Sequence, residues 1–384
     1  MTNLYSLMAV QDQIWDTIKS AIHKAQTADE LPVCELPNRS LEHPQNPNHG
    51  DYSSNIALRL AKPMRINPMQ IAELVKARID LKSPIASVSV AKPGFLNFNL
   101  ESAWVKNQVE KILEIGEEYG NIELGNSAKI QIEFVSVNPT GPLHIGHTRG
   151  AVVGSTLSNV LNAANYKVQN EYYVNDAGSQ VDNFAKSIYA QFKKTQGIDV
   201  NIPEDSYKGD YINEIALKIS NSYGLNIHKM SEKEALLNIK EYGLKLMLSS
   251  IKQDLDSLRV SMNEWFSEKS LFQDGTYKEI KEKLDKNNLL ERKDGALWFK
   301  SSQLGEEKDN VIEKSNGMPT YFASDIAYHH DKFANRKFDQ VIDVWGADHQ
   351  GHISRMKAAM GALDIDPEKL TILITQIVTF KAGS

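Results

Sequence analysis

Apolar residues recur at helical spacing near the start of the chain and at strand spacing further along. Over residues 4–26 they fall three and four positions apart, which predicts an amphipathic helix. A second helix is predicted at Asn67-Pro68, because Asn is a good N-cap and Pro suits the first helical position. The stretches Ile85–Val90 and Phe95–Leu100 alternate like strands on either side of a Lys-Pro-Gly turn. These elements predict a small α+β domain.

A different pattern follows a helix predicted over residues 102–115, which Gly116 should end. Residues 129–135 alternate as a strand, and a loop rich in Pro and Gly leads into a further predicted helix. Residues 167–174 are again strand-like. Strand, tight loop, helix and strand form a βαβ unit, which is typical of the opening of a parallel nucleotide-binding sheet.

The rest of the chain predicts an insertion and the second half of this sheet. Residues 180–300 have a mostly helical pattern, with breaks at 203–208 and around Gly224. After it we expect a strand at 339–344, a helix at 351–363 and a strand at 370–380. The expected fold class is therefore α/β, with a Rossmann-like doubly wound parallel sheet, a mostly helical insertion and a small α+β domain before it. The predicted domains are 1–120 and 121–384, with the insertion at about 180–300.

Composition excludes several classes of protein. Hydrophobic residues make up 41% and charged residues 24% of the 384 residues, which excludes general disorder. The longest apolar stretch, 370–380, is interrupted by polar residues and too short for a membrane span. The opening residues lack a basic region and a cleavage site, so no secretion signal is expected. A single cysteine, Cys34, excludes an internal disulfide and any zinc site with two thiolates. A cytoplasmic location is expected.

Charge is distributed unevenly along the chain. The net charge of −6 argues against indiscriminate nucleic-acid binding. Residues 59–92 nevertheless contain seven basic residues and two acidic ones, Glu73 and Asp80. This segment is either an ordinary solvated helical face or a contact surface for phosphates, and charge alone leaves both interpretations open.

The loop after the first strand of the βαβ unit carries the strongest chemical signal. It contains His144-Ile145-Gly146-His147, an H-x-G-H motif between a strand and a helix. Ligands bind at this place in open α/β sheets, and helix-terminal N–H groups there favour phosphates. Two imidazoles can donate hydrogen bonds to a triphosphate, and Gly146 leaves room for a base. The alternative is a pair of surface histidines in a turn.

Four longer segments extend this motif: EFVSVNPTGPLHIGHTRGAVVG at 133–154, EYYVNDAGSQV at 171–181, GMPTYFASDIAYHH at 317–330 and VWGADHQGHISRMKAA at 344–359. Together they resemble the catalytic domain of bacterial arginyl-tRNA synthetase. HIGH alone indicates a class I synthetase or a relative, whereas the other segments point to arginine. The stretch HGDYSSNIAL at 49–58 is similar to that family's N-terminal domain, which contacts the corner of the tRNA. The resemblance covers essentially the whole chain.

The resemblance implies an arginine pocket. Glu133 and Asn138 match positions that hold the guanidinium and amino groups, and Tyr321 and Asp325 match the pair that closes the pocket. The chemistry agrees, because a planar cation with five donors calls for carboxylates in a fixed fork. Glu133 on an otherwise apolar strand would be an unusual core residue without a cationic partner. Asp325 could instead cap a helix that begins at Ile326.

The resemblance also implies nucleotide and tRNA contacts. His144 and His147 are the expected catalytic residues. The expected ATP-binding residues are Thr140, Gly141, His144, Gly146, His147, Gly346, Asp348 and His349. The expected tRNA-binding residues are Arg59, Lys62, Arg65, Lys76 and Arg78. His329 and His330 are expected to be ordinary helix residues.

The implied reaction has two steps. Arginine attacks the α-phosphate of ATP, and a ribose hydroxyl of the tRNA then accepts the arginyl group. ATP is expected as its Mg²⁺ complex, and no protein-bound metal is expected. Arginine activation in this family usually requires bound tRNA. L-Arginine, ATP and an arginine-accepting tRNA are therefore the expected partners of a monomer without membrane contacts.

Two family features are absent from this sequence. No KMSKS-like signature follows the second half of the sheet, and the anticodon-binding domain is missing, so we expect a truncated chain of low or no activity. A similar stretch at Lys229–Lys233 lies in the insertion, where Ser231 and Glu234 predict a capping box instead. Other interpretations remain, namely another class I synthetase, an H-x-G-H nucleotidylyltransferase, and a noncatalytic tRNA-binding or partner protein.

Overall fold

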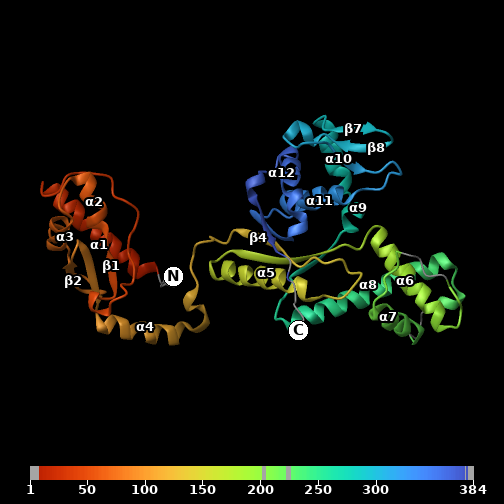
Figure 1. Cartoon of the computed structure of the whole chain (residues 1–384), viewed down its shortest axis with the longest axis horizontal. Helices are drawn as coiled ribbons and strands as arrows, with labels where there is room; N and C mark the ends of the chain where they lie inside the picture. Colours follow the sequence, from red (N-terminus) through yellow and green to blue (C-terminus); the bar gives the residue numbers. More distant parts are fainter. Residues whose placement is uncertain (1–7, 201–204, 222–225, 377, 379–384) are drawn as a thin grey trace, which may run out of the picture. The chain divides into compact units, whose positions relative to one another are not determined.

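In this computed structural model the chain divides into two compact units, and the boundary in the sequence falls between Glu123 and Leu124 (Figure 1). The structure describes residues 8–200, 205–221, 226–376 and 378. Parts of four predicted features therefore lie outside the described residues. They are the start of the first helix, the breaks at 203–204 and Gly224, and the end of the last strand.

The N-terminal unit packs helices against a three-stranded antiparallel sheet of order β1-β3-β2. Ile14, Ile18, Leu60, Val75 and Phe98 are fully buried in its core. The predicted first helix and strand pair are confirmed, and Asn67 caps its helix by accepting a hydrogen bond from the Met69 N–H. The elements are α1 (Met8–Thr27), β1 (Tyr52–Ser54), α2 (Ile56–Met64), α3 (Pro68–Ala77), β2 (Ile85–Ala91), β3 (Phe95–Leu100) and α4 (Ser102–Ile115).

The second unit is built on a five-stranded parallel sheet of order β11-β10-β4-β5-β6. Its strands are β4 (Lys129–Glu133), β5 (Lys167–Val174), β6 (Glu264–Ser267), β10 (Gln340–Gly346) and β11 (Leu370–Thr375). Helices α5 (Ile145–Ala163) and α8 (Glu232–Ser257) cover one face, and α11 (Tyr321–His330) and α12 (Ile353–Ala362) cover the other (Figure 1). The predicted fold class, a Rossmann-like sheet after a small α+β domain, is confirmed.

The segment predicted as mostly helical over 180–300 also contains strands. Helices α6 (Ser179–Thr195), α7 (Asp210–Asn221) and α8 pack together, but the chain then returns to the sheet as β6, which pairs in parallel with β5. The four residues of β6 are too few to show a strand periodicity in the sequence. A second excursion follows, with α9 (Ser270–Gln273), α10 (Thr276–Lys286) and an antiparallel sheet of β7 (Leu290–Lys293), β8 (Ala296–Phe299) and β9 (Asn310–Glu313).

The start of α8 has the predicted capping box. The Ser231 hydroxyl oxygen accepts a hydrogen bond from the Glu234 N–H at 3.4 Å, and the Glu234 carboxylate accepts one from the Ser231 N–H at 3.0 Å. The KMSKS-like residues Lys229–Lys233 therefore belong to an ordinary helix start.

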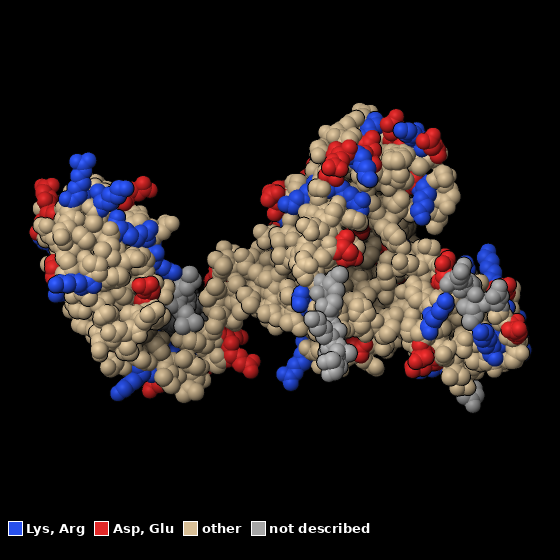
Figure 2. Space-filling view, in the orientation of Figure 1, with Lys and Arg blue, Asp and Glu red and all other residues tan. Residues whose placement is uncertain are grey.

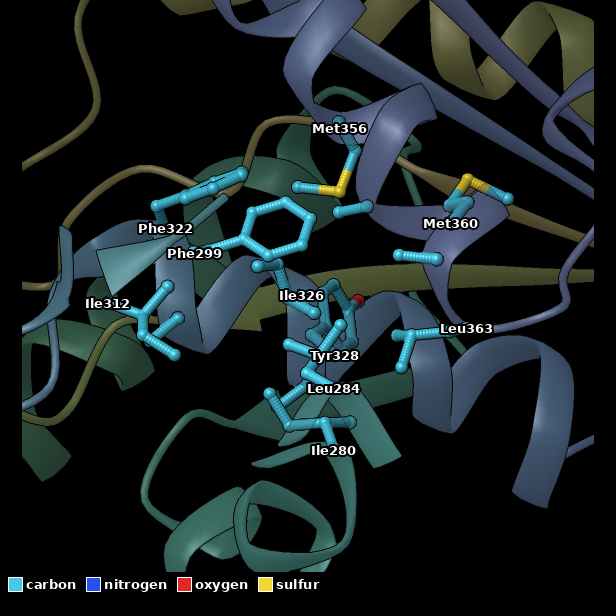
Figure 3. Packing of buried hydrophobic residues seen from close by; sticks show 14 of the residues in the cluster. Ile280, Leu284, Phe299, Ile312, Phe322, Ile326, Tyr328, Met356, Met360 and Leu363 are labelled. Carbon is cyan, nitrogen blue, oxygen red and sulfur yellow. The ribbon is translucent and has the colours of Figure 1, made fainter. Parts of the chain in front are cut away.

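The part of the second unit that contains α11 and α12 has its own apolar core (Figure 3). Phe322 and Ile326 of α11 lie beside Phe299 of β8 and Met356 of α12. Tyr328 enters the same cluster, and its hydroxyl group faces polar partners on the sheet. This packing joins α11 to strands β10 and β11 through Val341 and Leu370.

We expect Gly154→Ala to destabilise the second unit by about 1–3 kcal/mol. A Cβ atom at Gly154 in α5 would lie 2.2 Å from the ring of Phe134, which is fully buried. Gly150→Ala on the same helix is the matched control, because no described atom outside the helix lies within 4 Å of its added Cβ. The control should stabilise the unit by up to about 1 kcal/mol. Denaturant unfolding measures both, and a change of the same sign in both variants would contradict the packing argument.

Candidate active site

A cavity of about 170 Å³ lies where β4 and β10 end, beneath α11. This is the carboxyl edge of a parallel sheet, where ligands bind in open α/β folds. Its lining is rich in ionisable and aromatic side chains: Glu133, Val135, Ser136, Tyr173, Asp325, Tyr328, His329, Val344, Trp345, Gly346, His349 and His352.

Two of the four predicted arginine-binding residues line this cavity. Glu133 is the last residue of β4, and Asp325 lies in the second turn of α11. Asn138 and Tyr321 are not part of the lining; the Asn138 amide lies 3.0 Å from the amide of Asn175, and Tyr321 is 53% exposed. The aromatic surface of the lining comes from Tyr173, Tyr328 and Trp345.

The alternative role of Asp325 as a helix cap is wrong. Helix α11 begins at Tyr321, and the hydroxyl oxygen of Thr320 accepts a hydrogen bond from the Ala323 N–H at 3.4 Å. Asp325 is therefore inside the helix, and no described residue forms an ion pair with its carboxylate. Burial, with the neighbouring carboxylates of Glu133 and Glu268, raises the pKa of Asp325 to about 7, although His329 and Arg355 oppose this shift.

Glu268 adds a further carboxyl group close to this cavity. Its side chain is 4% exposed, and burial raises its pKa. Carboxyl groups in such surroundings are stabilised by a cationic ligand. The cavity therefore has the electrostatic character of a site for a positively charged group.

A buried network behind the cavity was not predicted from the sequence. The Lys332 ammonium donates to Glu133 at 2.8 Å and to Asp343 at 2.9 Å, and the second Asp343 oxygen lies 2.8 Å from His329 Nε2. Burial would raise the pKa of Asp343, but Lys332 and His329 outweigh it and lower the pKa to about 2. The prediction that His329 is an ordinary helix residue is wrong, because its ring also lines the cavity.

The two histidines of the H-x-G-H motif cap helix α5. His144 Nδ1 accepts a hydrogen bond from the Gly146 N–H at 3.1 Å, and His147 Nδ1 accepts one from the His144 N–H at 3.2 Å. Because each Nδ1 is an acceptor, each neutral ring carries its proton on Nε2. The rings stack 3.6 Å apart, and burial together with His144 lowers the pKa of His147.

The Nε2–H groups are therefore donors at a helix N-terminus, where anions are stabilised. Both rings also line a second cavity of about 330 Å³ between α5 and the end of α8. A Cβ at Gly146 would lie 2.9 Å from the His144 ring, so a larger residue there would displace the ring that caps the helix.

The remaining predicted nucleotide-binding residues lie in the loop before α5 and at the end of β10. Thr140 is buried, and its carbonyl oxygen accepts a hydrogen bond from Tyr211 of α7 at 2.8 Å; Gly141 follows it. Gly346 ends β10 and lines the first cavity together with His349, whereas Asp348 is exposed. The structure thus places His349 and Gly346 with Glu133 and Asp325, and the H-x-G-H residues at a neighbouring cavity.

The five predicted tRNA-binding residues lie on or next to α2 and α3 of the N-terminal unit. The Arg59 guanidinium donates to the Asn38 carbonyl oxygen at 2.8 Å, Arg78 is paired with Glu30, and Lys76 lies 3.7 Å from Glu73. Lys62 and Arg65 form no ion pair with a described residue. Figure 2 shows basic and acidic side chains mixed on the visible face of this unit.

No described helix has the length and apolar character needed to cross a membrane. Among the same residues, no cluster of three or more His, Cys, Asp or Glu side chains is arranged to hold a metal ion.

Comparisons with known proteins match both units. Residues 12–100 match the family model described as the arginyl-tRNA synthetase N-terminal domain, and residues 108–377 match that of the class I (R) tRNA synthetase catalytic domain. An arginine–tRNA ligase of Dehalococcoides mccartyi strain CBDB1 is 47% identical over 378 residues, which cover 98% of this chain and 68% of the relative. The arginine–tRNA ligase of Bacillus subtilis strain 168 is 42% identical over 370 residues, which cover 96% and 66%.

The fold likeness extends to a distant solved structure. Arginyl-tRNA synthetase of Thermus thermophilus superimposes with a TM-score of 0.61 at 20% identity, over 94% of this chain and 65% of that one. The chain spans about two thirds of the length of these relatives.

Proposed function

Because the chain belongs to the arginyl-tRNA synthetase family and carries its class I catalytic domain, we propose that it activates L-arginine with ATP and transfers the arginyl group to tRNA. The observation that carries this proposal is the acidic cavity at the carboxyl edge of the sheet. Glu133 and Asp325 line it, and the buried Asp325 carboxylate forms no ion pair with a described residue.

The guanidinium and amino groups of arginine are the proposed cations. A guanidinium presents five donors in one plane, which suits carboxylates that approach from different directions. Glu133 reaches the cavity from the sheet and Asp325 from α11, so the two carboxylates can contact separate edges of the ligand. Tyr173 and Trp345 offer apolar surface for its methylene groups. Asn138 and Tyr321 are assigned to the same pocket through the family motif, and both would have to turn toward the ligand.

ATP is proposed to bind across the first turn of α5 and the end of β10. The Nε2–H groups of His144 and His147 would donate to phosphate oxygens, with Thr140 and Gly141 in the loop before them. Gly346, Asp348 and His349 would lie on the adenosine side. Mg²⁺ would arrive with ATP as part of the substrate and help to neutralise its phosphates.

The proposed chemistry is mainly positioning and charge stabilisation. An arginine carboxylate oxygen attacks the α-phosphorus, and the bond to the β-phosphate oxygen breaks to release pyrophosphate. A tRNA ribose hydroxyl then attacks the arginyl carbonyl carbon, loses its proton and displaces AMP. No side-chain nucleophile takes part. We place this reaction in the cytoplasm, because the lone Cys34 suits a reducing compartment.

Titration with a nonhydrolysable arginyl-adenylate analogue tests this proposal. Glutamyl and cysteinyl analogues serve as controls, because they share the adenosine part and lack the guanidinium. Selective binding of the arginyl analogue is expected. Equal binding of all three would show that the pocket does not select the side chain. Binding of tRNA without any of the analogues would favour a noncatalytic tRNA-binding protein.

Affinity for L-arginine should rise with pH around pH 7. The Asp325 carboxyl group, whose pKa is about 7, must lose its proton to attract a guanidinium, which stays charged throughout. Affinity should fall by up to about tenfold for each pH unit below this pKa and level off above about pH 8. Calorimetric titration at several pH values measures the effect. The Asp325→Asn variant should lose the dependence, and an unchanged pH profile in that variant would assign the titration to another group.

The N-terminal unit, residues 1–120, is proposed to contact tRNA, and residues 121–384 to hold the catalytic domain with its insertion. Lys62→Ala and Arg65→Ala should each weaken tRNA binding about threefold and reduce its salt dependence. Arg78→Ala removes the same charge but should change affinity less, because Glu30 already neutralises Arg78. Filter binding at several salt concentrations measures the tRNA affinity of each variant and its salt dependence. A larger loss in Arg78→Ala than in Lys62→Ala would contradict the assignment.

A further inference from the structure

Three acidic side chains lie in one row across the middle of the second unit's sheet. Glu133 of β4 pairs in register with Glu171 of β5 on one side and with Asp343 of β10 on the other. Residues in register on parallel strands point to the same face. Glu171 and Asp343 are fully buried, and Glu133 is 9% exposed. Carboxylates side by side in a sheet repel one another, so the row requires cations.

The cations are Lys332, in the π-helical turn Asp331–Asn335 that follows α11, and Arg336, directly after that turn. Arg336 donates two hydrogen bonds to Glu171 at 2.6 and 2.9 Å. Lys332 is fully buried, and its ammonium lies between Glu133 and Asp343, 4.1 Å from the centre of the Tyr328 ring. A π-helical turn is frequent at functional sites, and here it carries the buried lysine.

Lys332 makes the two oxygens of Glu133 unequal. Glu133 Oε2 accepts the hydrogen bond from Lys332 at 2.8 Å, while no described residue forms a hydrogen bond with Oε1. The Glu133 side chain is 12% exposed, and Glu133 is the member of the row that lines the cavity. One oxygen is therefore anchored inside the protein, and the other is available to a ligand.

We propose that Lys332 is a positioning residue for the substrate, which anchors Glu133 Oε2 and so presents an ionised Oε1 to a cationic group of arginine. This inference rests on the proposed function and names a residue that the family motifs did not assign. Burial raises the pKa of Glu133, and Lys332 opposes that shift. Without Lys332 the buried carboxyl would hold its proton more tightly and attract a cation less.

A merely structural role is the competing explanation, because Lys332 also neutralises Asp343. The two roles differ in what Lys332→Met changes. A positioning role through Glu133 affects the arginyl ligand and leaves ATP binding intact, and it disappears once Glu133 is neutral. A structural role affects both ligands and persists when Glu133 is neutral.

The test is a double-mutant cycle of Lys332→Met and Glu133→Gln, with the arginyl-adenylate analogue and an ATP analogue as probes. Lys332→Met should weaken arginyl-analogue binding about 30-fold and ATP-analogue binding less than about threefold. In the Glu133→Gln background the same change should cost less than about threefold. Equal losses for both probes, or an equal loss in both backgrounds, would overturn the inference.

A second comparison covers the case in which Lys332→Met fails to fold. Lys332→Met/Asp343→Asn removes one positive and one negative charge, so the buried net charge is unchanged. It should still bind the arginyl analogue about 30-fold more weakly than Asp343→Asn alone. Equal binding of these two variants would overturn the inference and leave the proposed function standing. A wild-type chain that does not bind the arginyl analogue would overturn the proposed function, and this inference with it.

Discussion

Asp325→Asn should lower affinity for the arginyl-adenylate analogue by about 100-fold, because a charged hydrogen-bond acceptor is lost in a buried site. The substitution keeps the size of the side chain. Asp325 contributes to the cavity that Glu133 enters from the sheet, whereas the H-x-G-H rings line a different cavity. Affinity for an ATP analogue should therefore change by less than about threefold. Calorimetric titration with both ligands measures the two effects.

The unfolding free energy of the ligand-free variant provides an independent readout. The pKa of Asp325 is raised in the folded state, so the stability that this group contributes is present at low pH and lost as pH rises to about 7. Asp325→Asn should then be more stable than wild type at pH 8, by up to about 4 kcal/mol. Asp348→Asn is the matched control for stability, since Asp348 is exposed and its substitution should leave the unfolding free energy nearly unchanged. A variant that is less stable at pH 8 and loses both ligands would indicate damage to the fold.

His147→Asn should slow formation of arginyl-adenylate by about 100- to 1,000-fold, because it removes a donor directed at developing phosphate charge. The Asn oxygen can replace Nδ1 as acceptor for the His144 N–H, so the cap of α5 should survive. Single-turnover formation of the adenylate in the presence of tRNA measures the rate. Denaturant unfolding measures the stability that the helix cap contributes.

His147→Gln is the complementary variant. Its amide can reach the position of Nε2 and donate there, but it no longer caps the helix. It should keep more of the rate than Asn and lose about 1 kcal/mol of stability. Equal rates in the two variants, with the loss of rate following the loss of stability, would mean that His147 acts only as a helix cap.

Local patterns predicted most of the secondary structure. The strand pair Ile85–Val90 and Phe95–Leu100, the helix at Asn67 and the βαβ unit follow from periodicity, caps and turn residues, which act over a few neighbouring positions. Strand β6 and strand β1 were missed, because strands of four and three residues have no measurable period. Their place in a sheet depends on pairing with strands far along the chain.

The candidate site was likewise predicted only in part. Glu133 and Asp325 were found through the family motifs, but the row of Glu171, Glu133 and Asp343 exists only through the register of three strands. No local pattern relates these positions. Lys332 and His329 fall in a helical stretch whose sequence has no feature that marks them as site residues. The sequence indicated that Glu133 needs a cationic partner, and the structure supplies Lys332 for one of its oxygens.

The most direct test compares the affinity of the arginyl-adenylate analogue with that of its citrullyl counterpart. Citrulline replaces the guanidinium with a neutral urea of the same shape, so the comparison isolates the positive charge. If the carboxylates of Glu133 and Asp325 recognise that charge, the arginyl analogue should bind at least about 100-fold more tightly. Equal affinity for the two analogues would contradict the account, because it would mean that the acidic cavity does not select its ligand by charge.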